Sequence, residues 1–210
     1  MRLRVVNLGL PKSGTTTLGR ALRRAGLHVA DHRVHAGETK RPELEEAFVA
    51  DLLYKGYFAS GDPLAELQEF DGFSEISALR VNNPAWPQFD FGLIEALRQV
   101  HPDIRFVATW REAEEISTSM LNWTNMVERM VKAPLPGLPL GYGAEDAERV
   151  RWIVGHYSSL TRYFAEDPHF LLLDMAAEDA ADQLASFIGR PVPWWGVANR
   201  NLAAAKAGEA

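Results

Sequence analysis

Apolar and polar residues follow one another along the chain in blocks that predict strands and helices in turn. Short apolar runs predict strands at residues 3–8, 27–30, 72–76, 104–110 and 170–173. Apolar residues at helical spacing predict helices at residues 15–25, 42–53, 90–100, 113–131, 145–164 and 178–188. Strands that alternate with helices are typical of a parallel sheet covered on both faces. The pattern therefore predicts an α/β fold, a three-layer sandwich in which helices flank a central parallel β-sheet.

The predicted elements form a single domain over residues 1–210, a length that suits one sizeable core and is short for two. The longest connection, residues 133–144, is rich in proline and glycine. It is either a lid or binding loop, or a plain surface connection between two helices. Residues 202–210 are expected to form a disordered tail.

Composition removes several kinds of chemistry. The chain has no cysteine, which excludes disulfides, Cys-ligated zinc and thiol nucleophiles. Its 22 basic and 28 acidic residues give a net charge of −6, so no overall field favours nucleic acid, and any polyanion must be held locally. No apolar run approaches the ~20 residues of a membrane span, and the N-terminus lacks a signal-peptide core. A cytoplasmic protein without a nucleic-acid partner is expected.

An anion-binding loop is predicted at residues 9–17, GLPKSGTTT, where the first strand passes into the first helix. Backbone amides at a helix N-terminus are unpaired and carry partial positive charge, so they suit a phosphate or sulfate. Lys12 adds a full charge, and Gly14 allows the backbone to approach an anion closely. Hydroxyl donors come from Ser13, Thr15, Thr16 and Thr17. The loop is not a Walker A motif, because threonine rather than lysine follows its second glycine.

The segment PKSGTT resembles the 5′-phosphosulfate loop of the sulfotransferases that use 3′-phosphoadenosine 5′-phosphosulfate (PAPS), and the nearest likeness is to short bacterial-type members. The resemblance implies a P-loop NTPase-like sulfotransferase fold, with PAPS as cosubstrate and no metal required. It also implies that Lys12 contacts the phosphate and the bridging oxygen of the donor. The donor-binding residues carried over from this loop are Pro11, Lys12, Ser13, Gly14, Thr15, Thr16 and Thr17.

One departure from the family concerns the adenine of the donor. Many cytosolic members have a tryptophan where this chain has Thr17, and that ring helps to hold the adenine. A stacking ring must therefore come from elsewhere in this chain, and the candidates are Trp110, Trp194 and Trp195. Near the C-terminus, Asn199 or Arg200 is a further candidate contact to the nucleotide.

The family has a second motif, in which a strand leads into an arginine and a serine follows eight positions later. Here FVATW leads into Arg111, and Ser119 stands eight positions further on. An arginine can form a bidentate pair with phosphate, and the serine lies about two helical turns away on a similar face. The resemblance implies that both residues bind the 3′-phosphate, so that two separate cradles grip one PAPS molecule.

Sulfuryl transfer also needs a base that takes the proton of the acceptor, opposite a group that stabilises the leaving oxygen. The resemblance gives Lys12 the second role and a histidine or glutamate the first. Glu75 follows the residues GFS of the third predicted strand, and His32 follows the second strand. Asp31 and His35 could orient His32. Both candidate bases remain open at this point.

The resemblance implies a sulfotransferase that acts on a hydroxyl or amine of a small-molecule, lipid or glycan acceptor. Two alternatives remain. One is a catalytically inactive nucleotide-binding module of the same fold, which the lack of a clear catalytic histidine favours. The other is an atypical P-loop small-molecule kinase. The sequence identifies neither the acceptor nor the oligomeric state.

Overall fold

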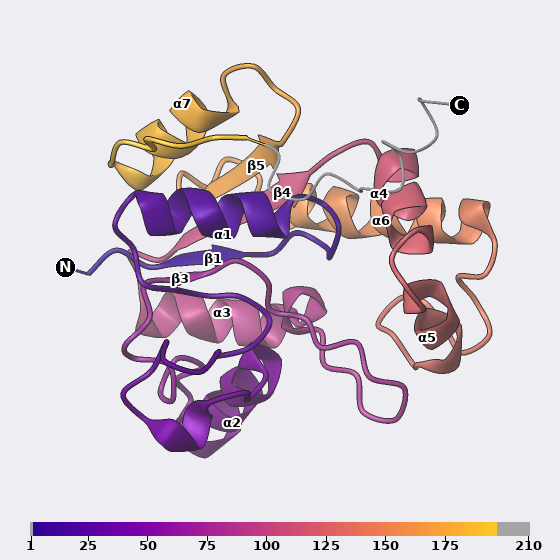
Figure 1. Cartoon of the computed structure of the whole chain (residues 1–210), viewed down its shortest axis with the longest axis horizontal. Coiled ribbons are helices and arrows are strands. Elements are labelled where there is room, and N and C mark those ends of the chain that lie inside the picture. Colours follow the sequence, from indigo (N-terminus) through magenta and orange to yellow (C-terminus); the bar gives the residue numbers. More distant parts are fainter. Residues whose placement is uncertain (1, 197–210) are drawn as a thin grey trace.

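The computed structural model describes residues 2–196 and has one sheet of five parallel strands (Figure 1). The strands are β1 (Val5–Asn7), β2 (Val29–Ala30), β3 (Gly72–Phe73), β4 (Arg105–Trp110) and β5 (Phe170–Asp174). Their order is β2-β3-β1-β4-β5, so β1 is central. Because all five strands are parallel, their carboxyl ends meet at one edge of the sheet, where ligands bind in open α/β folds.

Helices cover both faces of this sheet, which confirms the predicted α/β sandwich (Figure 1). The helices are α1 (Thr15–Arg24), α2 (Val49–Ser60), α3 (Phe91–Val100), α4 (Ala113–Leu121), α5 (Met126–Lys132), α6 (Asp146–Tyr163) and α7 (Ala180–Ile188), with short 3₁₀ turns at Pro42–Leu44 and Pro87–Phe89. One core cluster joins α1 and α7 to the sheet. A larger cluster joins α2, α3, α4 and α6 to it. Among residues 2–196, no helix has the length and apolar character needed to cross a membrane.

The prediction of a helix over residues 42–53 is wrong in its first half. The chain makes a 3₁₀ turn at Pro42–Leu44, and α2 begins only at Val49. Between them, Glu46 N donates to Val34 O at 2.7 Å, and Val34 N donates to Ala47 O at 3.0 Å. Glu46 has a φ of 61°, and Phe48 forms an isolated antiparallel bridge with Arg33. This turn and the bonds to the segment after β2 keep residues 45–48 out of the helix, although their local pattern favours one.

The predicted helix over residues 113–131 is also interrupted. It forms two helices, α4 and α5, separated by residues 122–125. Thr124 has a φ of 44°, a left-handed conformation that ends helical hydrogen bonding. Apolar residues continue at helical spacing through this point, so the periodicity alone does not reveal the break.

Candidate active site

A cavity of about 730 Å³ lies at the carboxyl edge of the sheet, and it brings together residues that are far apart in the sequence. Most of the predicted donor-loop residues line it, namely Pro11, Lys12, Gly14, Thr15, Thr16 and Thr17. Arg111 and Ser119 of the second motif line it as well, and so do both candidate bases, His32 and Glu75. The two motifs therefore open onto one space.

Ser13 is the donor-loop residue that does not line this cavity. Its side chain is fully buried. Its Oγ donates to Leu10 O at 2.6 Å and lies 2.7 Å from Thr109 Oγ1. The Ser13 hydroxyl thus ties the loop to the end of β4 and is turned away from the space where an anion would bind.

A network of buried polar side chains holds the donor loop against the ends of β1 and β4. Tyr157 of α6 donates its hydroxyl to Thr109 O at 2.8 Å and accepts from Leu10 N at 3.1 Å. Asn7 at the end of β1 accepts from Gly9 N at 2.9 Å. Burial raises the pKa of Tyr157 to about 12, so its hydroxyl stays protonated and can both donate and accept. The network therefore fixes the backbone of the first loop residues after β1.

The sequence analysis did not predict this hydrogen-bond network, although the sequence contains one signal for it. Asn7 and Thr109 are polar residues inside otherwise apolar strands, VVN and FVATW. Both are fully buried, and buried polar groups must find partners. Asn7 Nδ2 donates to Thr109 Oγ1 at 3.1 Å across the β1–β4 pair. Tyr157 gives no such signal, because its position matches the apolar face of a helix.

Two glycines allow the loop to pass close to its neighbours. A Cβ atom on Gly9 would lie 2.4 Å from Thr109 Oγ1 and 2.6 Å from Thr109 O. Gly14 has a φ of 116°, and a Cβ there would lie 2.7 Å from Met175 Cγ. There is therefore no room for a side chain at either position. Gly14 also adopts a left-handed backbone conformation that other residues rarely adopt.

Lys12 projects into the cavity from a backbone with a φ of 72°. Its Nζ lies 4.7 Å from the centroid of the Trp123 ring. Burial lowers the pKa of Lys12, an effect that the Glu75 carboxylate opposes and the Arg111 guanidinium reinforces. The loop and the second motif are therefore electrostatically coupled.

Arg111, directly after β4, also contacts the loop itself. Its Nη2 donates to Lys12 O at 3.0 Å, and its Nη1 lies 3.9 Å from a carboxylate oxygen of Glu115. Its Nε is buried and has no hydrogen-bond partner among residues 2–196. The side chain nevertheless lines the cavity, where its other N–H groups can pair with an anion.

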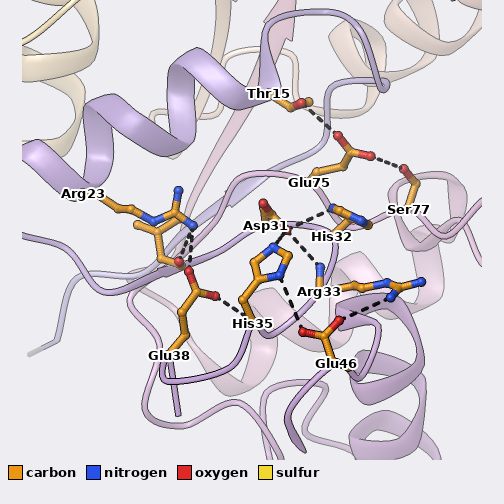
Figure 2. Close-up of polar contacts among 11 residues, drawn as sticks. Thr15, Arg23, Asp31, His32, Arg33, His35, Glu38, Glu46, Glu75 and Ser77 are labelled. Carbon is orange, nitrogen blue, oxygen red and sulfur yellow. Dashed lines mark hydrogen bonds and ion pairs between the residues drawn. The ribbon is translucent and has the colours of Figure 1, made fainter. Parts of the chain in front are cut away.

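Glu75 lies just beyond β3, beside the donor loop (Figure 2). Its carboxylate accepts from Thr15 Oγ1 at 2.9 Å and from Ser77 Oγ at 3.4 Å. Burial raises the pKa of Glu75 above its ordinary value, and the bonds from Thr15 and Ser77 only partly offset this. A carboxylate with a raised pKa at the cavity wall is suited to accept a proton near neutral pH.

His32 lies beyond β2 and is paired with Asp31, as Figure 2 shows. Its Nδ1 lies 3.0 Å from Asp31 Oδ1, which also lies 3.2 Å from His35 Nε2 and accepts from Arg33 N. The hydrogen bond to Asp31 raises the pKa of His32. Burial pushes the pKa of Asp31 upward, but the bonds from His32 and Arg33 outweigh it, and the pKa of Asp31 lies well below its usual range. The pair favours a charged imidazolium.

The three tryptophans considered for adenine stacking lie in different places. Trp110 lines a separate groove of about 540 Å³ beside α6. Trp194 lies under Arg20, whose guanidinium carbon is 5.1 Å from the ring centroid. Trp195 lines the cavity. The chain around it is tied to α1 where Thr17 Oγ1 donates to Gly196 O at 3.1 Å. Asn199, Arg200 and the expected tail at 202–210 lie outside the described residues.

Residues 133–144 connect α5 to α6 and are anchored on α6. Trp152 Nε1 donates to Pro136 O at 2.8 Å, and the Arg149 guanidinium donates to Gly143 O at 2.9 Å and to Ala144 O at 2.6 Å. None of these loop residues lines the cavity in this conformation. The lid role stays a prediction. No group of three or more His, Asp or Glu side chains within residues 2–196 is arranged to hold a metal ion.

The comparisons with known proteins give a family. A family model described as a sulfotransferase domain matches residues 4–138. The chain belongs to the sulfotransferase domain family. A search of curated proteins finds no match. The matched part of the sulfotransferase domain runs from β1 to the loop after α5 and contains both anion motifs and both candidate bases. Membership assigns sulfuryl transfer in general as the chemistry of the chain.

Proposed function

We propose that the protein transfers a sulfuryl group from PAPS to a hydroxyl or amine of a small-molecule, lipid or glycan acceptor. The observation that carries the proposal is that the loop around Lys12 and the pair Arg111–Ser119 line the same cavity. A donor with phosphate groups at two ends needs two cradles that open onto one space. The Arg111 guanidinium lines this cavity and can pair with phosphate through two N–H groups, which supports a phosphate at the second cradle.

In the proposed reaction, a bond forms between the acceptor oxygen or nitrogen and the donor sulfur. The bond from sulfur to the bridging oxygen breaks, and 3′-phosphoadenosine 5′-phosphate leaves with that electron pair. The Lys12 ammonium and the amides at the N-terminus of α1 stabilise the charge on the leaving oxygen. The acceptor proton passes to the base.

We assign the base to Glu75 rather than to His32. Glu75 is bonded to Thr15 of the donor loop, and it lies close enough to act on Lys12 electrostatically, so it lies beside the reacting groups. His32 is bonded to Asp31, which favours its protonated form, and an imidazolium has no lone pair to accept a proton. His32 instead places positive charge near Glu75, where it opposes the effect of burial on the Glu75 pKa.

We assign adenine stacking to Trp195, since it lines the cavity whereas Trp110 faces another groove and Trp194 lies under Arg20. The hydrogen bond between Thr17 and the backbone of Gly196 holds Trp195 next to the position where related enzymes carry a loop tryptophan. An exposed indole face stacks on nucleobases with little dependence on the base.

Thermal unfolding with 3′-phosphoadenosine 5′-phosphate tests the proposal. Ligand at about 100 times its dissociation constant should raise the melting temperature by roughly 5–10 °C. Lys12→Ala and Arg111→Ala should each remove most of this shift. Arg24→Ala, which changes an exposed arginine of α1, should keep it.

Three other outcomes would change the assignment. No shift at millimolar nucleotide would contradict the proposal, and a shift with Mg²⁺–ATP instead would favour a kinase. Nucleotide binding without transfer from PAPS to any of a panel of alcohols and amines would favour the inactive module.

A further inference from the structure

Trp123 lies in the break between α4 and α5. Its neighbours Met120 and Met126 are buried, with exposed fractions of 0% and 1%, whereas Trp123 is 44% exposed. Burial of the indole therefore does not explain why the helix is interrupted here. The turn, with Thr124 in a left-handed conformation, instead makes Trp123 part of the cavity wall.

The Trp123 ring at this wall contacts the Lys12 ammonium. The distance of 4.7 Å from Nζ to the ring centroid is inside the range of about 6 Å for a cation–π interaction. Within residues 2–196, the ammonium forms no hydrogen bond and no ion pair, and Glu75 and Arg111 act on it only through space. The same ring lies 5.9 Å from the guanidinium carbon of Arg129, which donates to Leu79 O at 3.1 Å.

An aromatic face holds an ammonium in a different way from a carboxylate. A carboxylate would cancel the charge and occupy the N–H donors, whereas an indole face attracts the cation and leaves N–H donors for an incoming anion. Lysine also has a flexible four-carbon stem, so an unheld ammonium would occupy many positions. Contact with Trp123 restricts the ammonium to one side of the cavity while it keeps its full charge.

We propose that Trp123 is a positioning residue for Lys12 and holds its ammonium where the bridging oxygen of the donor binds. This inference rests on the proposed function, since it needs an anion at the donor loop. Trp123 itself needs no contact with the nucleotide. Its effect on binding must therefore depend on the charge of Lys12.

A double-mutant cycle with 3′-phosphoadenosine 5′-phosphate as the probe tests this dependence. Trp123→Ala should weaken binding about 2- to 30-fold when Lys12 is present, the range expected for a cation–π contact. In the Lys12→Met background, the same change should have no further effect. Trp123→Phe should restore most of the binding, and Leu121→Ala, at an exposed position at the end of α4, should leave it unchanged. Equal weakening in both backgrounds would overturn the proposal.

Chemical labelling tests the contact without any donor. An amine-reactive acetylating reagent, read by peptide mass spectrometry, should modify Lys12 faster in Trp123→Ala than in the wild type. Lys55 of α2 serves as the internal reference. Its Nζ lies 2.8 Å from a carboxylate oxygen of Glu66. Unchanged labelling of Lys12 overturns the positioning role. A wild-type protein that does not bind the nucleotide overturns the proposed function instead, and labelling then still decides whether Trp123 covers Lys12.

Discussion

At the scale of single residues, the protonation of Glu75 should control the pH dependence of transfer. Its raised pKa means that the carboxylate form, which accepts the proton, appears as pH rises through that raised value. We expect kcat/KM to rise with pH over this range and Glu75→Gln to lower kcat by about 10²- to 10⁴-fold. Steady-state pH profiles measure both effects. A larger loss in His32→Gln than in Glu75→Gln would move the base to His32.

The same residue should reduce the stability of the fold. A carboxyl group whose pKa is raised on folding binds more protons in the folded state, so stability falls as pH rises from its ordinary value near 4.5 through the raised one. Glu75→Gln removes this loss. The variant should melt above the wild type at pH 7–8, and the difference should shrink toward pH 4. Melting curves at these pH values check the prediction, and a lower melting temperature at pH 8 would count against a buried charge at this position.

Asp31 should set the charge of His32. The hydrogen bond to Asp31 raises the pKa of His32, so this interaction stabilises the fold below the ordinary histidine pKa and is lost as pH rises through the raised value. Asp31→Asn should lower the pKa of His32, which an NMR titration of the imidazole protons measures. His35→Gln tests the other ring that contacts Asp31 and should have a smaller effect.

Sequence motifs identified which residues stand around the cavity, but not how each side chain turns. Lys12 and Arg111 could be placed near the carboxyl edge because each follows a predicted strand, whereas Ser119 was expected there from the resemblance to the second sulfotransferase motif; all three line the cavity. The orientation of Ser13 could not, because it depends on Thr109, 96 positions later. The contact of Lys12 with Trp123 likewise depends on a helix break that apolar periodicity does not reveal.

At the scale of elements, the turn from β1 into the donor loop should tolerate no side chain at Gly9. Gly9→Ala would place a methyl group against the Thr109 side chain and backbone, and we expect a loss of more than about 2 kcal/mol. Gly155→Ala is the matched control, because it adds a methyl group with nothing within 4 Å on α6. That change should stabilise the fold by about 0.5–1 kcal/mol through better helix propensity. Urea unfolding compares the two variants, and similar stabilities would rule out the tight approach at Gly9.

Element types were easier to predict than element boundaries. The strand and helix of the donor loop were predicted correctly because glycine, proline and periodicity agree there. The start of α2 was not, because residues 45–48 pair with the segment after β2. Such pairing joins residues that are distant along the chain, so the local sequence pattern does not predict it.

At the scale of the whole molecule, the segment at residues 194–196 should complete the nucleotide site. Trp195→Ala should weaken binding of 3′-phosphoadenosine 5′-phosphate about 5- to 150-fold, the range for loss of one base stack. Trp194→Ala, beside it but under Arg20, should change binding little. Isothermal titration measures both, and quenching of tryptophan fluorescence by the nucleotide should disappear in Trp195→Phe. Quenching that persists there would assign the stack to another ring.

The α/β class and the position of the site at the strand ends could both be predicted from the sequence, because alternating elements and parallel pairing impose them. The order of the strands could not, since it depends on which distant strands pair.

The position of β5 at the outside of the sheet has a practical consequence for anyone who shortens this protein. The family match ends at residue 138, before β5, so a gene fragment cut at that boundary would encode a sheet with β4 as its new rim. The bare amides and carbonyls of β4 would then be free to recruit strands from other molecules. Such a fragment should be recovered as aggregate rather than as a smaller working enzyme.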